Sequence, residues 1–162
     1  MYYPIQLDVS GLHVVIVGGG KIAYRKALAF VRMGKTFTVV SKSFSRDFSQ
    51  LASEKITFIQ GAFDWNHLKD ADLVIAATDD ANLNAQIGAY AKQRGKLVNV
   101  VSDSAYSNFL NAAVIKNGDL VLTVSTAGKS PKLAKQIKNE LENLYGEKQG
   151  RTFNVDEFEE ML

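Results

Sequence analysis

Short apolar runs alternate with segments of helical spacing along the first two thirds of the chain. The apolar runs occupy 12–17, 36–40, 56–59, 72–77 and 96–101. Several lack the apolar–polar alternation of a half-exposed strand, which is typical of a parallel sheet covered on both faces. Residues 21–33 and 80–93 have helical apolar spacing, and a weaker helical signal lies over 44–53 and 65–69. The pattern predicts an α/β fold with a parallel sheet and helices on both faces.

The pattern changes after residue 101. NAAVIKNGDLVLTVS predicts two strands joined by a turn at Asn117-Gly118, and GKSPKLAKQIKNELENL predicts a helix that Ser130 caps and Pro131 begins. One hairpin and one helix cannot bury both faces of the hairpin. We therefore expect 111–147 to dock on the first domain, on a second subunit, or on both. The predicted domains are 1–110, 111–147 and a short acidic tail, 148–162, with a polar linker and a short amphipathic helix.

Composition narrows the class of protein. A chain of 162 residues with 46% apolar and 22% charged residues can bury one good core. The sequence has no cysteine, which excludes disulfides and thiolate metal sites and suits a reducing cytoplasm. A net charge of +2 gives no reason to expect nucleic acid as a partner, and no apolar run is long enough to span a membrane. The isolated His13 and His67 predict no metal site.

A glycine-rich turn follows the first apolar run. In LHVVIVGGGKIAYRKALAFVRMG, residues Gly18, Gly20 and Ala23 fill the G-x-G-x-x-G/A pattern of a dinucleotide-binding turn. The first glycine permits the tight turn, the second lets the backbone approach a pyrophosphate, and the small third residue lets helix and strand pack closely. This position, between a strand and a helix, predicts a Rossmann-type domain with cofactor contacts at Gly18–Ile22: Gly18, Gly19, Gly20, Lys21 and Ile22.

The end of the second apolar run carries Ser41, Lys42 and Ser43, which we expect to contact the cofactor. Many NAD-binding folds have an acidic residue here for the adenosine ribose. No acid stands here, so Lys42 either meets the 2′-phosphate of NADP or is a solvated loop charge.

The end of the fourth run reads Ala76-Ala77-Thr78-Asp79-Asp80. Its small residues let a cofactor lie against the backbone. We expect Thr78 and Asp79 near the cofactor and Asp80 as the N-cap of the following helix.

The fifth run ends in Asn99-Val100-Val101-Ser102-Asp103. We expect Val101 to contact the cofactor. A carboxylate here, on Asp103, would lie beside the nicotinamide, where a general base is useful. The alternative is a turn-forming Ser-Asp pair.

The loop STAGKSPK, 125–132, is a separate signal. A loop of small residues that opens a helix presents free N–H groups, and Lys129 and Lys132 stand alongside. This arrangement suits carboxylates or phosphates, although an ordinary helix cap with exposed lysines has the same pattern.

Together these motifs resemble the precorrin-2 dehydrogenase family, the N-terminal module of siroheme synthases. The resemblance covers nearly the whole chain and is carried by YPIQLDVSGLHVVIVGGGKIAYRKA, AATDDANLNAQI and GKLVNVVSDSAYSNFLNAAVIKNGDLVLTVSTAGKSPKLAKQIKNELE, in that order. The run from Val-Asn-Val-Val through Ser-Asn-Phe to Ser-Thr-x-Gly-Lys-Ser-Pro is far more specific than the glycine turn.

The resemblance implies a Rossmann-type domain followed by a dimerisation segment whose strands pair across a two-fold axis. It implies a cytoplasmic homodimer that oxidises precorrin-2 to sirohydrochlorin and passes a hydride to NAD, with NADP not excluded. Asp103 is then the catalytic candidate. The carboxylate-rich substrate would bind at the late loop through Ser125, Thr126, Lys129 and Ser130.

The chain departs from the family pattern at Ser102, where many members have an aspartate. Its carboxylate comes one residue later, at Asp103, and a shift of one residue can turn a side chain to the other side. Two alternatives stay open. One is a bifunctional enzyme that also inserts ferrous iron, and the other is a non-catalytic module that senses a dinucleotide or a tetrapyrrole.

Overall fold

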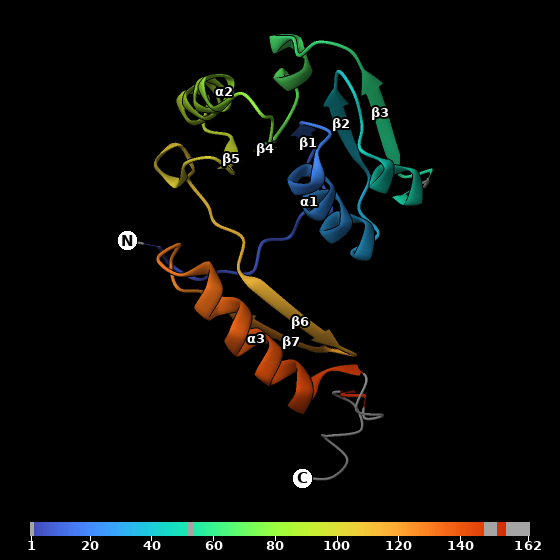
Figure 1. Cartoon of the computed structure of the whole chain (residues 1–162), viewed down its shortest axis with the longest axis vertical. Coiled ribbons are helices and arrows are strands. Elements are labelled where there is room, and N and C mark those ends of the chain that lie inside the picture. Colours follow the sequence, from blue (N-terminus) through green and yellow to red (C-terminus); the bar gives the residue numbers. More distant parts are fainter. Residues whose placement is uncertain (1, 52–53, 148–151, 155–162) are drawn as a thin grey trace. The chain divides into compact units, whose positions relative to one another are not determined.

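The computed structural model describes residues 2–51, 54–147 and 152–154. The chain divides into two compact units, Met1–Phe109 and Leu110–Leu162 (Figure 1). The amphipathic helix predicted after Glu147, and most of the acidic tail, lie outside the described residues. Within the described ranges, no helix has both the length and the apolar character that a bilayer crossing requires.

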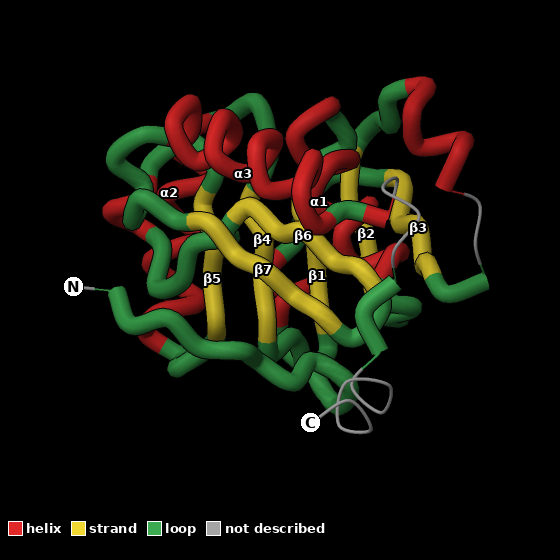
Figure 2. The backbone as a smooth tube through the Cα atoms, turned by 90° about the horizontal axis from the view of Figure 1, so that it is seen from below, coloured by secondary structure: helices red, strands yellow, loops and turns green. Residues whose placement is uncertain are grey.

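The first unit is built on a five-stranded parallel sheet in the order β3-β2-β1-β4-β5. Its strands are β1 (Val14–Val17), β2 (Phe37–Ser41), β3 (Ile56–Gln60), β4 (Leu73–Ala76) and β5 (Leu97–Val100). Figure 2 shows them side by side, with β3 and β5 at the two edges. The strand order reverses between β1 and β4, which is where doubly wound sheets bind their ligands. The predicted Rossmann-type fold is confirmed.

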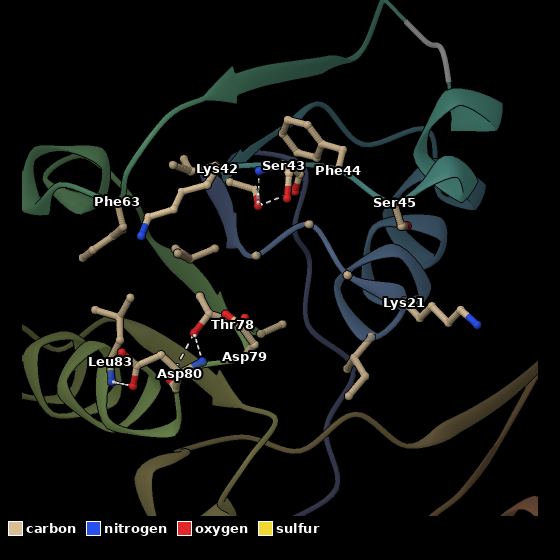
Figure 3. Close-up of a pocket in the computed structure, with 18 of the residues that line it drawn as sticks. Lys21, Lys42, Ser43, Phe44, Ser45, Phe63, Thr78, Asp79, Asp80 and Leu83 are labelled. Carbon is tan, nitrogen blue, oxygen red and sulfur yellow. Dashed lines mark hydrogen bonds between the residues drawn. The ribbon is translucent and has the colours of Figure 1, made fainter.

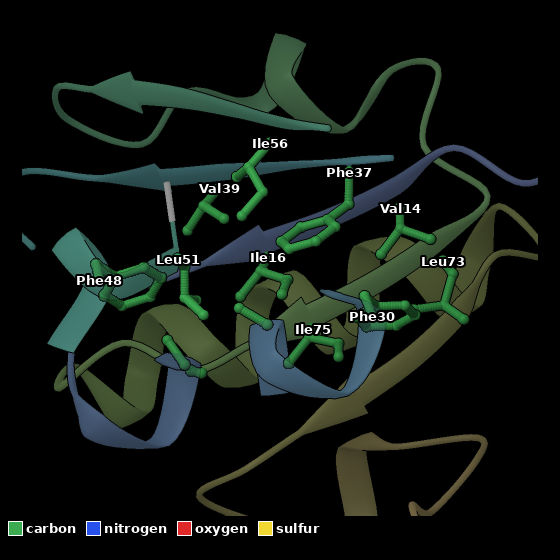
Figure 4. Close-up of a cluster of buried hydrophobic side chains, with 13 residues drawn as sticks. Val14, Ile16, Phe30, Phe37, Val39, Phe48, Leu51, Ile56, Leu73 and Ile75 are labelled. Atoms are coloured by element: carbon green, nitrogen blue, oxygen red, sulfur yellow. The ribbon is translucent and has the colours of Figure 1, made fainter. Parts of the chain in front are cut away.

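Both faces of this sheet are covered, which explains the continuous apolar runs. Along β1, Val14 and Ile16 pack on the side of α1 (Lys21–Arg32) and the short 3₁₀ helix η1 (Arg46–Leu51) (Figure 4). Val15 and Val17 pack on the other side, against α2 (Ala81–Gln93) and η2 (Trp65–Leu68). The two segments with weak helical spacing are therefore 3₁₀ helices, too short to set up a clear period.

The outer edge of β5 is paired by side chains in place of a sixth strand. Ser107 and Asn108 follow η3 (Ser104–Tyr106) and run back along β5. Oγ of Ser107 accepts from the Val100 N–H at 2.8 Å, and Oδ1 of Asn108 accepts from the Val98 N–H at 2.7 Å. Ser107 and Asn108 of the Ser-Asn-Phe motif therefore supply hydrogen-bond acceptors to main-chain N–H groups that an edge strand would leave unpaired.

The second unit contains an antiparallel hairpin, β6 (Ala113–Asn117) and β7 (Leu120–Val124), and the helix α3 (Pro131–Tyr145). The hairpin is confirmed, but its turn lies one residue later than predicted. Asn117 pairs with Leu120, so Gly118 and Asp119 form the turn. Gly118 has φ +57°, and a Cβ there would lie 2.2 Å from the Phe153 carbonyl oxygen, so the backbone requires glycine at this residue.

Candidate functional site

A cleft of about 660 Å³ lies at the carboxyl ends of the strands in the first unit (Figure 3). It brings together residues predicted from three separate segments of the sequence. These are Gly18, Gly19, Gly20, Lys21 and Ile22 after β1, Ser41, Lys42 and Ser43 at the end of β2, and Thr78 and Asp79 after β4. Of the predicted cofactor contacts, only Val101 is missing from the lining.

Gly18 and Gly19 are required by the fold itself. Gly18 has φ +128°, and a Cβ there would lie 2.2 Å from the carbonyl oxygen of Ala77. A Cβ on Gly19 would lie 2.0 Å from the carbonyl oxygen of Ser43. The N–H of Gly18 donates to the Val40 carbonyl at 2.8 Å. These contacts hold the turn tightly against β2 and the segment after β4.

Gly20 is different, because no atom of the residues that the structure describes excludes a side chain there. A Cβ on Gly20 would meet nothing within 4 Å, and its backbone is extended, with φ −84° and ψ −176°. Gly20 also lines the cleft. No contact within the described protein therefore requires glycine at this position. Close approach of a pyrophosphate to the backbone does require it, so Gly20 fits a bound dinucleotide.

The N-terminus of α1 is open to an anion. No side chain caps this helix at Gly20, and its first turn contains no acidic residue. In contrast, Asp80 caps α2 by accepting from the Asn82 and Leu83 N–H groups, as predicted. Among the described residues, no side chain caps the N–H groups that begin α1; this end of the helix lines the cleft, and the helix dipole favours a phosphate there.

Hydroxyl groups dominate the side of the cleft that follows β2. Oγ of Ser41 donates to the Ser43 carbonyl at 2.7 Å, and Oγ of Ser45 is buried without a hydrogen-bond partner among the described residues. The side chain of Lys42 extends towards Phe63, whereas the side chain of Lys21 points away from Lys42 and Phe63 (Figure 3). On this side a polar ligand would meet the ammonium group of the exposed Lys42, whereas the buried Oγ of Ser45 has almost no accessible surface to offer it.

Thr78 lines the cleft where β4 ends, but its hydroxyl already has partners. Oγ1 of Thr78 donates to Oδ1 of Asn84 at 2.7 Å and accepts from the Asp80 N–H at 3.2 Å. Its small size and its main chain therefore shape the cleft, and a hydrogen bond from its hydroxyl proton to a cofactor would have to replace an existing one.

Asp103 lies beyond β5, outside the lining of the cleft. Its carboxylate accepts from the Ala105 N–H at 2.8 Å and caps η3, so the turn-forming role considered for this residue is present. Ser102, one residue earlier, has its Oγ 3.5 Å from Nδ2 of Asn84. Val101 packs against the core on the α1 side of the sheet. A contact of Val101 with the cofactor and catalysis by Asp103 stay predictions.

In the second unit, the predicted substrate loop is folded by its own hydroxyl groups. Oγ of Ser125 accepts from Ala127, Oγ1 of Thr126 from Ser130, and Oγ of Ser130 from Leu133, each through the main-chain N–H. Ala127 has φ +52°, a left-handed conformation that is uncommon outside glycine. Lys129 is exposed. The cap at Ser130 is confirmed, whereas contacts of these four residues with a substrate stay predictions.

Sequence reasoning missed Gly61 and Phe63, which line the cleft just after β3. The rule that ligands bind at the carboxyl ends of parallel strands applies to β3 as well and would have found them. Leu83 also lines the cleft, from the first turn of α2. No local sequence signal marks Leu83, because its place depends on how the helix packs on the sheet.

Comparison with known proteins agrees with this geometry. The model of a putative NAD(P)-binding family matches residues 5–113, and that of the sirohaem biosynthesis protein central domain matches 117–144. The solved structure of SirC, precorrin-2 dehydrogenase, superposes with a TM-score of 0.75 at 31% identity, over 90% of this chain and 72% of that one. The chain belongs to the precorrin-2 dehydrogenase and siroheme synthase family.

Relatives in this family include longer proteins. The chain is 38% identical to a siroheme synthase of Photorhabdus laumondii over 144 residues, which are 88% of this chain and 31% of that protein. It is 37% identical to siroheme synthase 2 of Aeromonas hydrophila, over 88% of this chain and 30% of that protein. The chain therefore spans about a third of the length of the curated relatives it matches.

Proposed function

We propose that this chain oxidises precorrin-2 to sirohydrochlorin and transfers the hydride to NAD⁺. The observation that carries the proposal is the likeness to SirC, precorrin-2 dehydrogenase, over 90% of this chain. The cleft supports the proposal for two reasons. The space beside Gly20 is not filled by any atom of the described residues, and α1 begins without a side-chain cap. Both features fit a pyrophosphate.

The oxidation removes one hydride and one proton from the macrocycle. NAD⁺, when bound, supplies the hydride acceptor. The chain's own residues hold the dinucleotide: the turn at Gly18–Gly20 and the start of α1 bind its pyrophosphate, while the segments after β2 and β4 bind on either side. Asp103 is our candidate for the base that takes the proton, since it lies in the segment that follows β5, the strand paired with β4.

The finer assignment of the cofactor is NAD. Lys42 is the residue on which this choice depends, because it stands at the end of β2, where an acidic residue would otherwise bind the adenosine ribose. We assign the side chain of Lys42 to solvent at the edge of the cleft. If its ammonium group instead reached a 2′-phosphate, Lys42 would favour NADP.

The second unit, in this proposal, binds the substrate and forms a homodimer. Lys129 and the capped start of α3 suit the carboxylates of a tetrapyrrole. One face of the hairpin exposes Val114 and Val121, at 52% and 41%, which suits a partner copy of the same chain. We place the enzyme in the cytoplasm, which the absence of cysteine suits.

The test is turnover of the natural substrate. Purified protein is mixed anaerobically with precorrin-2 and NAD⁺, with NADP⁺ in parallel, and the absorbance spectrum is followed. We expect the spectrum of sirohydrochlorin to develop faster with NAD⁺ than with NADP⁺. No change with either cofactor, from folded protein shown to bind NADH, would overturn the proposal and favour a sensing role.

A further inference from the structure

Asn84 is a buried polar residue that none of the roles above explains. It lies in the first turn of α2 and is fully buried. Its Oδ1 accepts from the Thr78 N–H at 3.0 Å, and its Nδ2 donates to the Thr78 carbonyl at 3.0 Å. One side-chain amide therefore pairs with both main-chain polar groups of Thr78, as a neighbouring strand would.

The main chain of Thr78 needs this partner because the sheet ends before it. The ladder between β4 and β5 stops at the pair Ala76 and Val100, with one further bond from the Val101 N–H to the Ala76 carbonyl. Thr78 is partly buried and lines the cleft. Asn84 therefore fixes the wall of the cleft at the point where the regular backbone pairing has ended.

The same amide reaches the next strand end. Nδ2 of Asn84 lies 3.5 Å from Oγ of Ser102, which follows β5 and precedes Asp103. Asparagine alone among residues of its size offers both the acceptor and the two donors that these contacts use. Aspartate keeps the acceptors without the donors, and glutamine is longer by one methylene group.

We propose that Asn84 is a positioning residue for the half of the dinucleotide that lies beyond β4. In a sheet of this strand order, the pyrophosphate lies at the turn after β1 and the adenosine half beyond β2, so the other half extends over the end of β4. Asn84 acts through Thr78, which lies between it and the cleft. The inference rests on the dinucleotide site of the proposed function.

The experiment compares NADH with ADP, which carries only the adenosine half. The variants are Asn84→Asp and Asn84→Ala, and the control is Asn82→Asp, the same change at an exposed position of the same helix. NADH binding is followed by energy transfer from Trp65, the single tryptophan, whose ring centroid is 5.1 Å from that of the cleft residue Phe63. ADP binding is measured by calorimetry.

We expect the Kd of NADH to rise about tenfold in both Asn84 variants, while the Kd of ADP stays within about twofold. The control variant Asn82→Asp is expected to keep the wild-type Kd for both NADH and ADP. An equal loss for NADH and ADP, or unchanged NADH binding, would overturn the proposal. Failure of both variants to fold, by circular dichroism, would also overturn it, since Asn84 would then serve the fold. If wild-type protein binds NADH but does not oxidise precorrin-2, the proposed function is refuted. The comparison of NADH with ADP binding in the Asn84 variants then still tests the role of Asn84.

Discussion

At the scale of single residues, the three glycines of the turn do different work. Gly18 and Gly19 avoid clashes of 2.2 Å and 2.0 Å with main-chain oxygens, whereas Gly20 avoids no contact with the protein. The G-x-G-x-x-G/A pattern accounts for Gly18 and Gly20 in the same way, whereas Gly19 stands at a position that the pattern leaves free. Only the structure separates the two glycines that the backbone requires from Gly20, which lines the cleft and meets no such contact.

Gly20→Ala is expected to weaken NADH binding at least tenfold with little change in stability. The added methyl group occupies the space proposed for the pyrophosphate, while an alanine N-cap in place of glycine costs about 1 kcal/mol or less. The measurements are an NADH titration and thermal unfolding. Gly11→Ala is the matched control, because a Cβ there also meets nothing within 4 Å and Gly11 lies outside the cleft. Equal NADH affinity in the two variants would contradict the assignment of Gly20.

Lys42→Ala tests the choice of cofactor. Wild-type protein should bind NADH more tightly than NADPH, and the variant should keep its NADH affinity within about threefold, because an exposed lysine contributes little. Titrations with both reduced cofactors measure this. Tighter binding of NADPH by the wild type, with that preference lost in the variant, would assign Lys42 to a 2′-phosphate and refute NAD.

Asp103→Asn and Asp103→Ser separate catalysis from capping. Both side chains can still cap η3, but neither can take up a proton, so we expect turnover of precorrin-2 to fall about 100-fold or more in each. NADH binding and thermal stability should stay near wild type. Turnover at the wild-type rate in either variant would reduce Asp103 to a helix cap.

At the scale of elements, hydrophobic patterning located all five strands of the sheet to within about two residues. It failed where side-chain contacts rather than periodicity set the structure. The hairpin turn moved by one residue because Asn117 is buried in β6, where its Nδ2 donates to the Tyr145 carbonyl at 2.8 Å. The capping box of η2, formed by Asp64 and His67, likewise has no periodic signature.

Asn108→Ala should destabilise the first unit by about 1–3 kcal/mol, because it leaves the buried N–H of Val98 without its acceptor. Urea unfolding measures the change as a lower midpoint with an unchanged slope. Asn82→Ala, an exposed asparagine on α2, is the control and should change stability by less than about 0.5 kcal/mol. A midpoint for Asn108→Ala equal to that of the control would show that the β5 edge does not need this side chain.

At the scale of the whole molecule, the sequence predicted the class of fold and most of the cleft, since strand ends in a parallel sheet converge by topology. Gly61 and Phe63 after β3 follow from the same rule. Leu83 and Asn84 do not, because their roles depend on the rotation of α2 against the sheet. For the same reason, no local pattern could show that Ser102 faces Asn84. The cap that Asp103 forms on η3 is a local contact, and the alternative of a turn-forming Ser-Asp pair predicted it.

The proposed hydride transfer from precorrin-2 to NAD⁺ is tested by the ratio of NADH formed to sirohydrochlorin formed. Limiting precorrin-2 is oxidised anaerobically with excess NAD⁺, and both products are quantified by absorbance. Because one hydride leaves each macrocycle, we expect one NADH for each sirohydrochlorin. Sirohydrochlorin without matching NADH, or NADH without sirohydrochlorin, would contradict it.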